Sequence, residues 1–371
     1  MQIIYIRTFA EVAIILIAQN KNQQLIQADP TLDKTQPYYC PSCHKRVHLK
    51  CGAIIRPHFA HFQNDTCEVF AEGETFEHIE GKIQLNQWLK TLGLQVEMEA
   101  YLPALKQRPD LLVYTSEKPI ALEFQCSPIP IEKVAERTRG YLKAGYKVVW
   151  ILGKKFTYKN RLTAFHKACL TKELNLVHYD TEKEELRIRG SFYLDSEERM
   201  RCLQRKFTLG EAVDSKKLRT KKVVRRAPNL QKRHQQLLFW RGEKMSEFQK
   251  ALYQNGDNLV SMPKELYAVL PSEWMVAEFS YLWKYQLLLW LERQPQHKII
   301  TKKSLTKWLN QEQVEFYELP QITTEQSLQP FYEYLEILTL SHCVKKMGRQ
   351  KWSIQHPAKR YKFLEDKLKF D

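Results

Sequence analysis

Two acidic residues in neighbouring apolar segments are the first candidates for chemistry in this chain. Asp110 begins the apolar segment 110–114, and Glu123 lies inside the apolar segment 120–125. The turn sequence at 116–119 separates them, so the pattern predicts a hairpin with both carboxylates on one face. A carboxylate inside an apolar strand is costly unless it is paired or bound to a metal. The pair is therefore either a site for a hard cation such as Mg²⁺ or Mn²⁺, or two ordinary strand-end charges.

A second group of candidate ligands lies nearer the N-terminus. Cys40 and Cys43 form a Cys-x-x-Cys pair, and His58 and His61 form a His-x-x-His pair at helical spacing. Two thiolates and two imidazoles suit a closed tetrahedral zinc site of the structural kind. The alternative is a reduced thiol pair beside surface histidines. Further candidates for the fourth ligand are His48, Cys51 and Cys67.

A helix is predicted on each side of the carboxylate segments. The first, over residues 74–92, places Glu74, His78 and Lys82 on one face because they are spaced four residues apart. Such spacing alone most often indicates a solvated polar face. The second helix, over residues 131–144, is followed by a further apolar strand. The expected order is helix, three strands, helix, strand.

The chain is strongly basic, and this bears on its partners. It has 371 residues, a net charge of +16 and a pI near 9.3. A protein with this excess of positive charge is expected to bind a polyanion, and nucleic acid is the first candidate. The alternative is a generally basic surface with no anionic partner. The run at 216–226 is either a solvated linker or a strip that contacts phosphates. Aromatic residues at helical spacing in 234–371 favour a core over a base-stacking platform.

The composition also limits the cellular context. The sequence has no apolar run of membrane-spanning length and no evident signal peptide, so no membrane partner and an intracellular location are expected. The eight cysteines are then expected to be thiols or metal ligands rather than disulfides. Walker and dinucleotide-binding motifs are absent from the sequence.

Four segments are expected from these patterns. They are a β-hairpin and zinc-finger-like domain at 1–68, a domain with the carboxylate pair at 69–190, a basic linker at 191–233 and a helical domain at 234–371. We therefore expect an α+β multidomain protein with a mostly α-helical C-terminal domain.

The motifs together resemble a known family. Pro109-Asp110 followed by Glu123-Phe124-Gln125 resembles the PD-(D/E)xK nuclease superfamily. With the cysteine and histidine pairs and the helix at 74–92, the layout over about residues 1–155 is similar to the CoiA-like competence proteins. The resemblance implies a central α/β/α nuclease core in a cytoplasmic protein. It also implies a role in natural transformation, when incoming DNA strands are processed and recombined.

The resemblance also implies roles for individual residues. Asp110, Glu123 and His78 would hold Mg²⁺ or Mn²⁺, with Glu74 as a second helix candidate. Gln125 occupies the place of the superfamily lysine, and a neutral amide orients water without carrying a charge. The side chains expected to position the DNA strand are Lys82, Arg137 and Tyr141.

The expected activity is metal-dependent hydrolysis of single-stranded or branched DNA. The zinc module and the basic helical half would bind DNA or a recombination partner. The alternative is a non-catalytic DNA-binding adaptor, or a mediator that recruits a recombinase, and Gln125 is the residue that favours it.

Overall fold

The computed structural model describes residues 14–41, 43–52, 57–62, 75–208, 211 and 230–369. Glu74, Cys67 and the basic run at 216–226 lie outside these residues, so the predictions made for them are not addressed by the structure. Within the described ranges, every helix is too short or too polar to cross a membrane.

An antiparallel sheet of six short strands forms the N-terminal part, with the order β1-β6-β5-β4-β2-β3. The expected early hairpin is present as the β2–β3 pair. The core of this sheet is small, with Ile15, Val47 and Phe59 among its buried apolar residues. Its strands are β1 (Ile14–Ile15), β2 (Ile17–Gln19), β3 (Leu25–Gln27), β4 (Tyr38–Tyr39), β5 (Arg46–Lys50) and β6 (His58–His61).

A mixed seven-stranded sheet forms the centre of the molecule, in the order β13-β12-β11-β10-β9-β8-β7. Strands β9, β10 and β11 are parallel, and the outer strands pair antiparallel. The strands are β7 (Gln95–Met98), β8 (Leu111–Tyr114), β9 (Ile120–Gln125), β10 (Lys147–Leu152), β11 (Leu176–Asp180), β12 (Glu185–Leu194) and β13 (Met200–Thr208).

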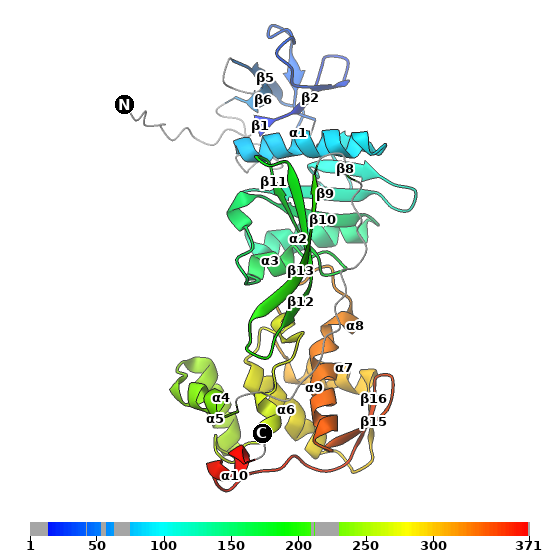
Figure 1. Ribbon diagram of the computed structural model, residues 1–371. Helices are drawn as coiled ribbons and strands as arrows, with labels where there is room; N and C mark the ends of the chain where they lie inside the picture. Colours follow the sequence, from blue (N-terminus) through cyan, green and yellow to red (C-terminus); the bar gives the residue numbers. More distant parts are fainter. Residues whose placement is uncertain are drawn as a thin grey trace, which may run out of the picture.

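One helix covers each face of the central sheet. Helix α1 (Phe76–Thr91) lies between the central and N-terminal sheets (Figure 1), and its Trp88 packs with Phe124 of β9 in one apolar cluster. Helix α2 (Ile131–Lys143) makes the parallel crossover from β9 to β10 and packs on the opposite face, beside the short helix α3 (Ala164–Ala168). The arrangement is helix, sheet, helix, because each helix buries its apolar stripe against one face.

The central sheet extends further along the chain than the sequence suggested. Strand β13 lies inside the segment expected to be a linker, and it pairs with β12 from Glu185 to Leu194. This hairpin reaches the C-terminal half, where the Leu194 amide donates to the Pro271 carbonyl at 3.0 Å. Strand β13 is largely exposed and contains several polar residues, so it lacks the apolar run that marks its buried neighbours.

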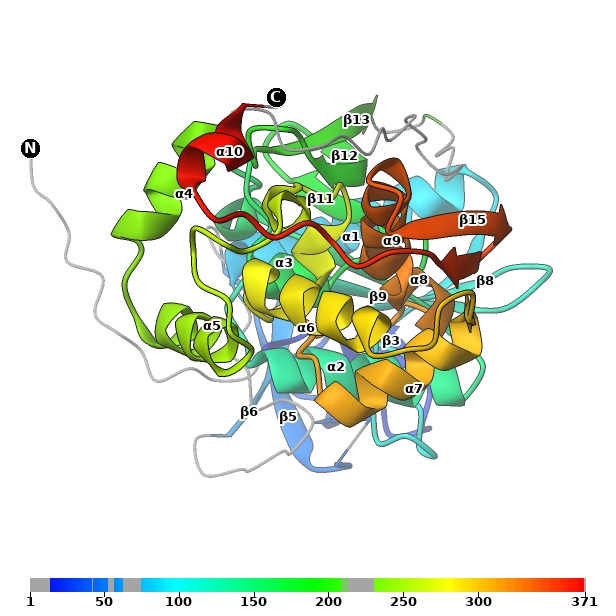
Figure 2. The same cartoon turned by 90° about the horizontal axis from the view of Figure 1, so that it is seen from below.

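The C-terminal half is mainly helical around an aromatic core. Phe279 and Trp283 are buried in this core, as the helical spacing of the aromatics predicted, and Trp308 and Trp352 are almost fully buried there as well. A three-stranded sheet, β14-β16-β15, was not expected. Figure 2 shows α4 and α5 on one side of this half and β15 on the other. The elements are α4 (Leu230–Phe239), α5 (Glu243–Gln254), α6 (Ser280–Glu292), β14 (Ile299–Thr301), α7 (Lys302–Glu312), α8 (Thr324–Ser327), α9 (Gln329–Leu340), β15 (Val344–Gly348), β16 (Lys351–Ile354) and α10 (Leu364–Leu368).

Candidate functional site

Asp110 and Glu123 lie at the same end of two neighbouring strands. Leu111 of β8 pairs with Leu122 of β9, so one further step of this antiparallel register sets Asp110 opposite Glu123. The Phe124 amide donates to Asp110 Oδ2 at 2.7 Å, which fixes the Asp110 carboxylate against β9. The turn and the strand register therefore bring the two carboxylates to the same end of neighbouring strands.

Helix α1 supplies the groups that contact Asp110. His78 Nε2 lies 3.0 Å from Asp110 Oδ2, and Lys82 Nζ lies 3.8 Å from Oδ1. Thr75 caps the helix by accepting a hydrogen bond from the His78 amide at 3.2 Å, which fixes the start of this turn. Burial alone would raise the pKa of Asp110, but His78, Lys82 and the Phe124 amide outweigh it and hold that pKa well below its ordinary value.

Helix α2 supplies the groups that contact Glu123. The Tyr141 hydroxyl donates to Glu123 Oε1 at 2.6 Å, and Arg137 donates to the same oxygen. Burial and the nearby Asp110 charge raise the pKa of Glu123, while Arg137 opposes that shift. Each carboxylate is thus held by a different helix, from a different face of the sheet.

Three residues expected to position a DNA strand are turned inward instead. The side chains of Lys82 and Tyr141 are fully buried, and Arg137 is three-quarters buried. Lys82 and Arg137 each pair with a carboxylate, because a buried cation without such a partner would be strongly destabilising. In this conformation Lys82 and Tyr141 cannot touch a bound strand, which corrects the role that the sequence assigned to them.

Gln125 does not point at the carboxylates. Its Nε2 donates to the Ser127 carbonyl at 2.6 Å, beyond the end of β9. The ammonium nearest to Asp110 among those described is that of Lys82, which comes from α1 rather than from β9.

Glu99 is the residue of this site that the sequence pattern missed. It is 3% exposed, and its Oε1 accepts from Lys82 Nζ at 2.7 Å while Arg108 lies 3.3 Å from Oε2. Oε2 also accepts from the amides of Leu16 and Ile17, both at 3.3 Å, so it joins the N-terminal sheet to the central one.

The backbone at Glu99 supports the same conclusion. Its φ of 54° lies in the left-handed region, and its amide donates to the Asp110 carbonyl at 2.9 Å. A non-glycine residue in that region costs about 1–2 kcal/mol, so surrounding contacts must stabilise it. A Glu with positive φ gives no signal in the sequence.

A second cluster of ligand atoms lies in the N-terminal sheet. Cys40 Sγ, Cys43 Sγ and one His61 ring nitrogen all lie within 4.8 Å of one another. The knuckle closes because the His44 amide donates to the Cys40 carbonyl at 2.9 Å, with a left-handed backbone at His44. Among the described residues, this is the group of three or more such side chains close enough to share one metal ion. It is a possible Cys2His metal site.

His58 is not part of that cluster. Residues 58–61 form strand β6 rather than the helical turn that the spacing suggested. Side chains three positions apart in a strand face opposite ways, so only His61 can face the cysteines. His58 pairs with Lys50 in the sheet, on the side of His48. The predicted four-ligand set is therefore reduced to three within the described residues.

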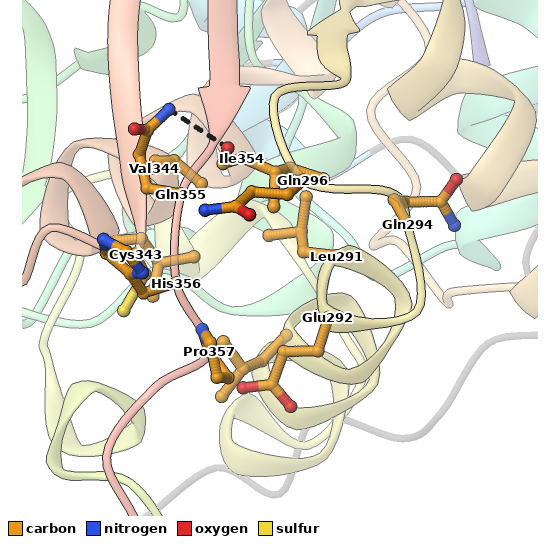
Figure 3. Close-up of a pocket in the computed structure, with 12 residues that line it drawn as sticks. Leu291, Glu292, Gln294, Gln296, Cys343, Val344, Ile354, Gln355, His356 and Pro357 are labelled. Atoms are coloured by element: carbon orange, nitrogen blue, oxygen red, sulfur yellow. Dashed lines mark hydrogen bonds between the residues drawn. The ribbon is translucent and has the colours of Figure 1, made fainter.

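The C-terminal half contains a separate pocket of about 260 Å³, between α6 and β16 (Figure 3). Its acidic residue, Glu292, is already held by Arg360, whose Nη2 lies 3.0 Å from Oε2. Burial raises the pKa of the Cys343 thiol to about 12, so this thiol is not a ready nucleophile. Its acidic residue and its thiol are therefore both poor candidates for catalysis.

Comparisons with known proteins agree with this layout. The family described as "Competence protein CoiA, nuclease-like domain" matches residues 74–222, and "Competence protein CoiA, N-terminal domain" matches residues 17–70. The competence protein CoiA of Bacillus subtilis (strain 168) is 36% identical over 138 residues, which are 37% of this chain and 35% of that protein. The aligned stretch thus spans about a third of that relative.

The fold and these matches define the class. A helix-flanked mixed sheet with paired carboxylates at one strand end is a nuclease-like α/β domain, here joined to a β-rich N-terminal unit. Across these two parts the chain belongs to the CoiA-like competence protein family.

Proposed function

We propose that this protein is a metal-dependent deoxyribonuclease of the PD-(D/E)xK type that processes DNA strands taken up during natural transformation. The observation that carries the proposal is the placement of Asp110 opposite Glu123, with His78 beside them, in a nuclease-like domain. These oxygen and imidazole donors fit Mg²⁺ or Mn²⁺. A cation held there would supply Lewis acidity and lower the pKa of a bound water.

The side chains have distinct tasks in this proposal. Asp110 and Glu123 hold the cation, and His78 either joins them or fixes the orientation of Asp110 through its 3.0 Å contact. Lys82 would keep Asp110 ionised, because its ammonium lies 3.8 Å from that carboxylate. Arg137 would release Glu123 and meet a phosphate oxygen when DNA enters.

The cluster of Cys40, Cys43 and His61 would hold a structural Zn²⁺. A small sheet with a limited apolar core gains stability from such a crosslink. The bound ion would keep the N-terminal unit folded over α1.

The deciding experiment is cleavage of single-stranded, double-stranded and branched DNA with Mg²⁺ or Mn²⁺. The native protein should cut, and Asp110→Ala or Glu123→Ala should lower the rate by at least about 100-fold, in line with the loss of a key electrostatic group. Absence of cutting with either metal, or equal cutting by both variants, would refute a nuclease.

A second function is favoured by two contacts in the site. Gln125 donates to Ser127 and Glu123 is paired with Arg137, so the groups needed for cleavage are partly engaged. The domain would then serve as a cytoplasmic DNA-binding adaptor or as a mediator that recruits a recombinase. DNA binding without cutting in the same assay would support it.

A further inference from the structure

The C-terminal half contains a small module with a distinctive order of elements. Helix α6, strand β14, helix α7, the one-turn helix α8, helix α9 and the hairpin β15–β16 follow one another, and the sheet order is β14-β16-β15. This order of helices and strands is the winged-helix arrangement, in which a β-hairpin stands beside a helix-turn-helix pair. The nuclease-like site is not part of the module, so its role is a separate question.

One side of the module carries basic residues from α7. Lys303 and Lys307 are exposed, and Lys302 is partly exposed at the helix start. The three lysines line an open basin of about 710 Å³ along the helix, together with polar residues of α7 and α8. Like charges this close repel one another, and a polyanion relieves that repulsion.

The hairpin carries further cations, and one of them lies next to the start of α7. Lys351 of β16 pairs with Thr301, the residue directly before α7, so it lies next to the helix start. Lys345 and Arg349 of the hairpin are exposed as well. Lys346 of the hairpin is paired with an acidic residue, at 2.6 Å from Glu336 of α9.

A single acidic residue marks where the two sets of cations meet. Glu325 of α8 accepts a hydrogen bond from Gln350 at the hairpin tip at 3.0 Å, and it lies 3.7 Å from Lys302 of α7. The helix start and the hairpin tip therefore belong to one surface. We call this surface, formed by the basic residues of α7 and of the β15–β16 hairpin, the basic wing surface.

Helix α9 holds the position that usually reads bases, but its sequence does not suit that task. It contains no lysine or arginine, and most of its side chains are buried. Contacts from the basic wing surface would therefore reach the phosphate backbone, which carries no sequence information.

We propose that the basic wing surface binds the backbone of duplex DNA without sequence preference, independently of any cleavage at Asp110. Helix-turn-helix pairs dock on duplexes, and cations spread over a helix and a hairpin match phosphates on the two sides of a groove. DNA is the favoured duplex because the chain belongs to a competence family. The surface would hold the recipient duplex while a strand is processed elsewhere on the protein.

The test measures binding of a labelled 20-base-pair duplex to the full chain as a function of salt. The background is Asp110→Ala, so binding is scored without cleavage. Lys303→Ala with Lys351→Ala removes two phosphate contacts, which should lower the slope of log affinity against log salt by about 2 and weaken binding at 0.1 M salt roughly 60-fold.

The matched control is Lys232→Ala with Lys250→Ala, two exposed lysines on α4 and α5 across the same half. This pair should change the slope by less than about half a unit. Lys303→Arg with Lys351→Arg should retain the native slope, because charge is preserved.

Three results would overturn the proposal. The first is an equal salt slope for the test and control pairs. The second is a loss of affinity in the test pair that is seen only with a single-stranded 20-mer, and the third is such a loss seen only with duplex RNA. Each is distinct from failure of the nuclease, which this assay does not measure.

Discussion

Glu99 should stabilise the junction between the N-terminal sheet and the nuclease-like domain. Its carboxylate accepts from Lys82 at 2.7 Å and from the amides of Leu16 and Ile17 at 3.3 Å, and it lies 3.3 Å from Arg108. Lys82 and Arg108 have side chains that are 0% and 6% exposed, so neither can turn to water when this partner is removed. Removing one member of such a buried pair costs about 3–5 kcal/mol.

We therefore expect Glu99→Ala to lower the free energy of unfolding by about 3–5 kcal/mol. Glu99→Gln keeps an acceptor but loses the charge, and it should cost about 2 kcal/mol, the value of a hydrogen bond to a charged group. Urea unfolding followed by tryptophan fluorescence measures both. Glu97→Gln is the matched control, because Glu97 is exposed on β7, two residues before Glu99, and should change stability by less than about 0.5 kcal/mol.

Hydrogen exchange gives a local readout of the same junction. The amides of Leu16 and Ile17 should exchange faster in Glu99→Ala, because their acceptor is gone. A loss of less than about 1 kcal/mol in Glu99→Ala, with unchanged exchange at both amides, would refute the reasoning.

Three further predictions follow from single contacts. Gly81→Ala should destabilise the protein by about 1–3 kcal/mol in urea unfolding, because its Cβ would lie 2.0 Å from the Phe124 ring; no change would mean that the ring moves freely. His61→Ala should abolish bound zinc, as measured by elemental analysis, whereas His58→Ala should keep about one zinc per chain. An equal loss of zinc in the two variants would contradict the three-ligand cluster. Burial lowers the pKa of His178 from 6.5 to about 4, so the unfolded chain binds this proton more readily than the folded one. The free energy of unfolding should therefore fall by roughly 3 kcal/mol as pH drops from 6.5 to 4. His178→Gln should flatten this pH dependence, and an unchanged pH dependence in that variant would contradict the role of His178.

The predicted parts of the site share a physical cause. Asp110 and Glu123 lie in two short apolar strands with a tight turn between them, and such a turn leaves little choice of register. Helices α1 and α2 were predicted for a related reason, since each carries an apolar stripe that must be buried against a sheet. Local periodicity is readable without any knowledge of distant contacts.

The errors have physical causes as well. His58 and His61 have the spacing of a helical turn, yet pairing with β5 makes the segment a strand and turns one of them away. Lys82 falls on a polar helix face, yet that face is buried against Glu99 and Asp110. In both cases a partner far along the chain decided the outcome.

The sequence by itself determined the family of this protein, the carboxylate pair and the two helices that flank it, because these depend on residue type and short-range spacing. Only the tertiary structure decided which helix neutralises each carboxylate, because His78 and Arg137 approach from opposite faces of the sheet. It also decided that Glu99 joins two sheets and that cations of α7 and the β15–β16 hairpin share one surface. Burial and ion pairing arise from segments that are distant in sequence, and no local pattern records which of them will meet.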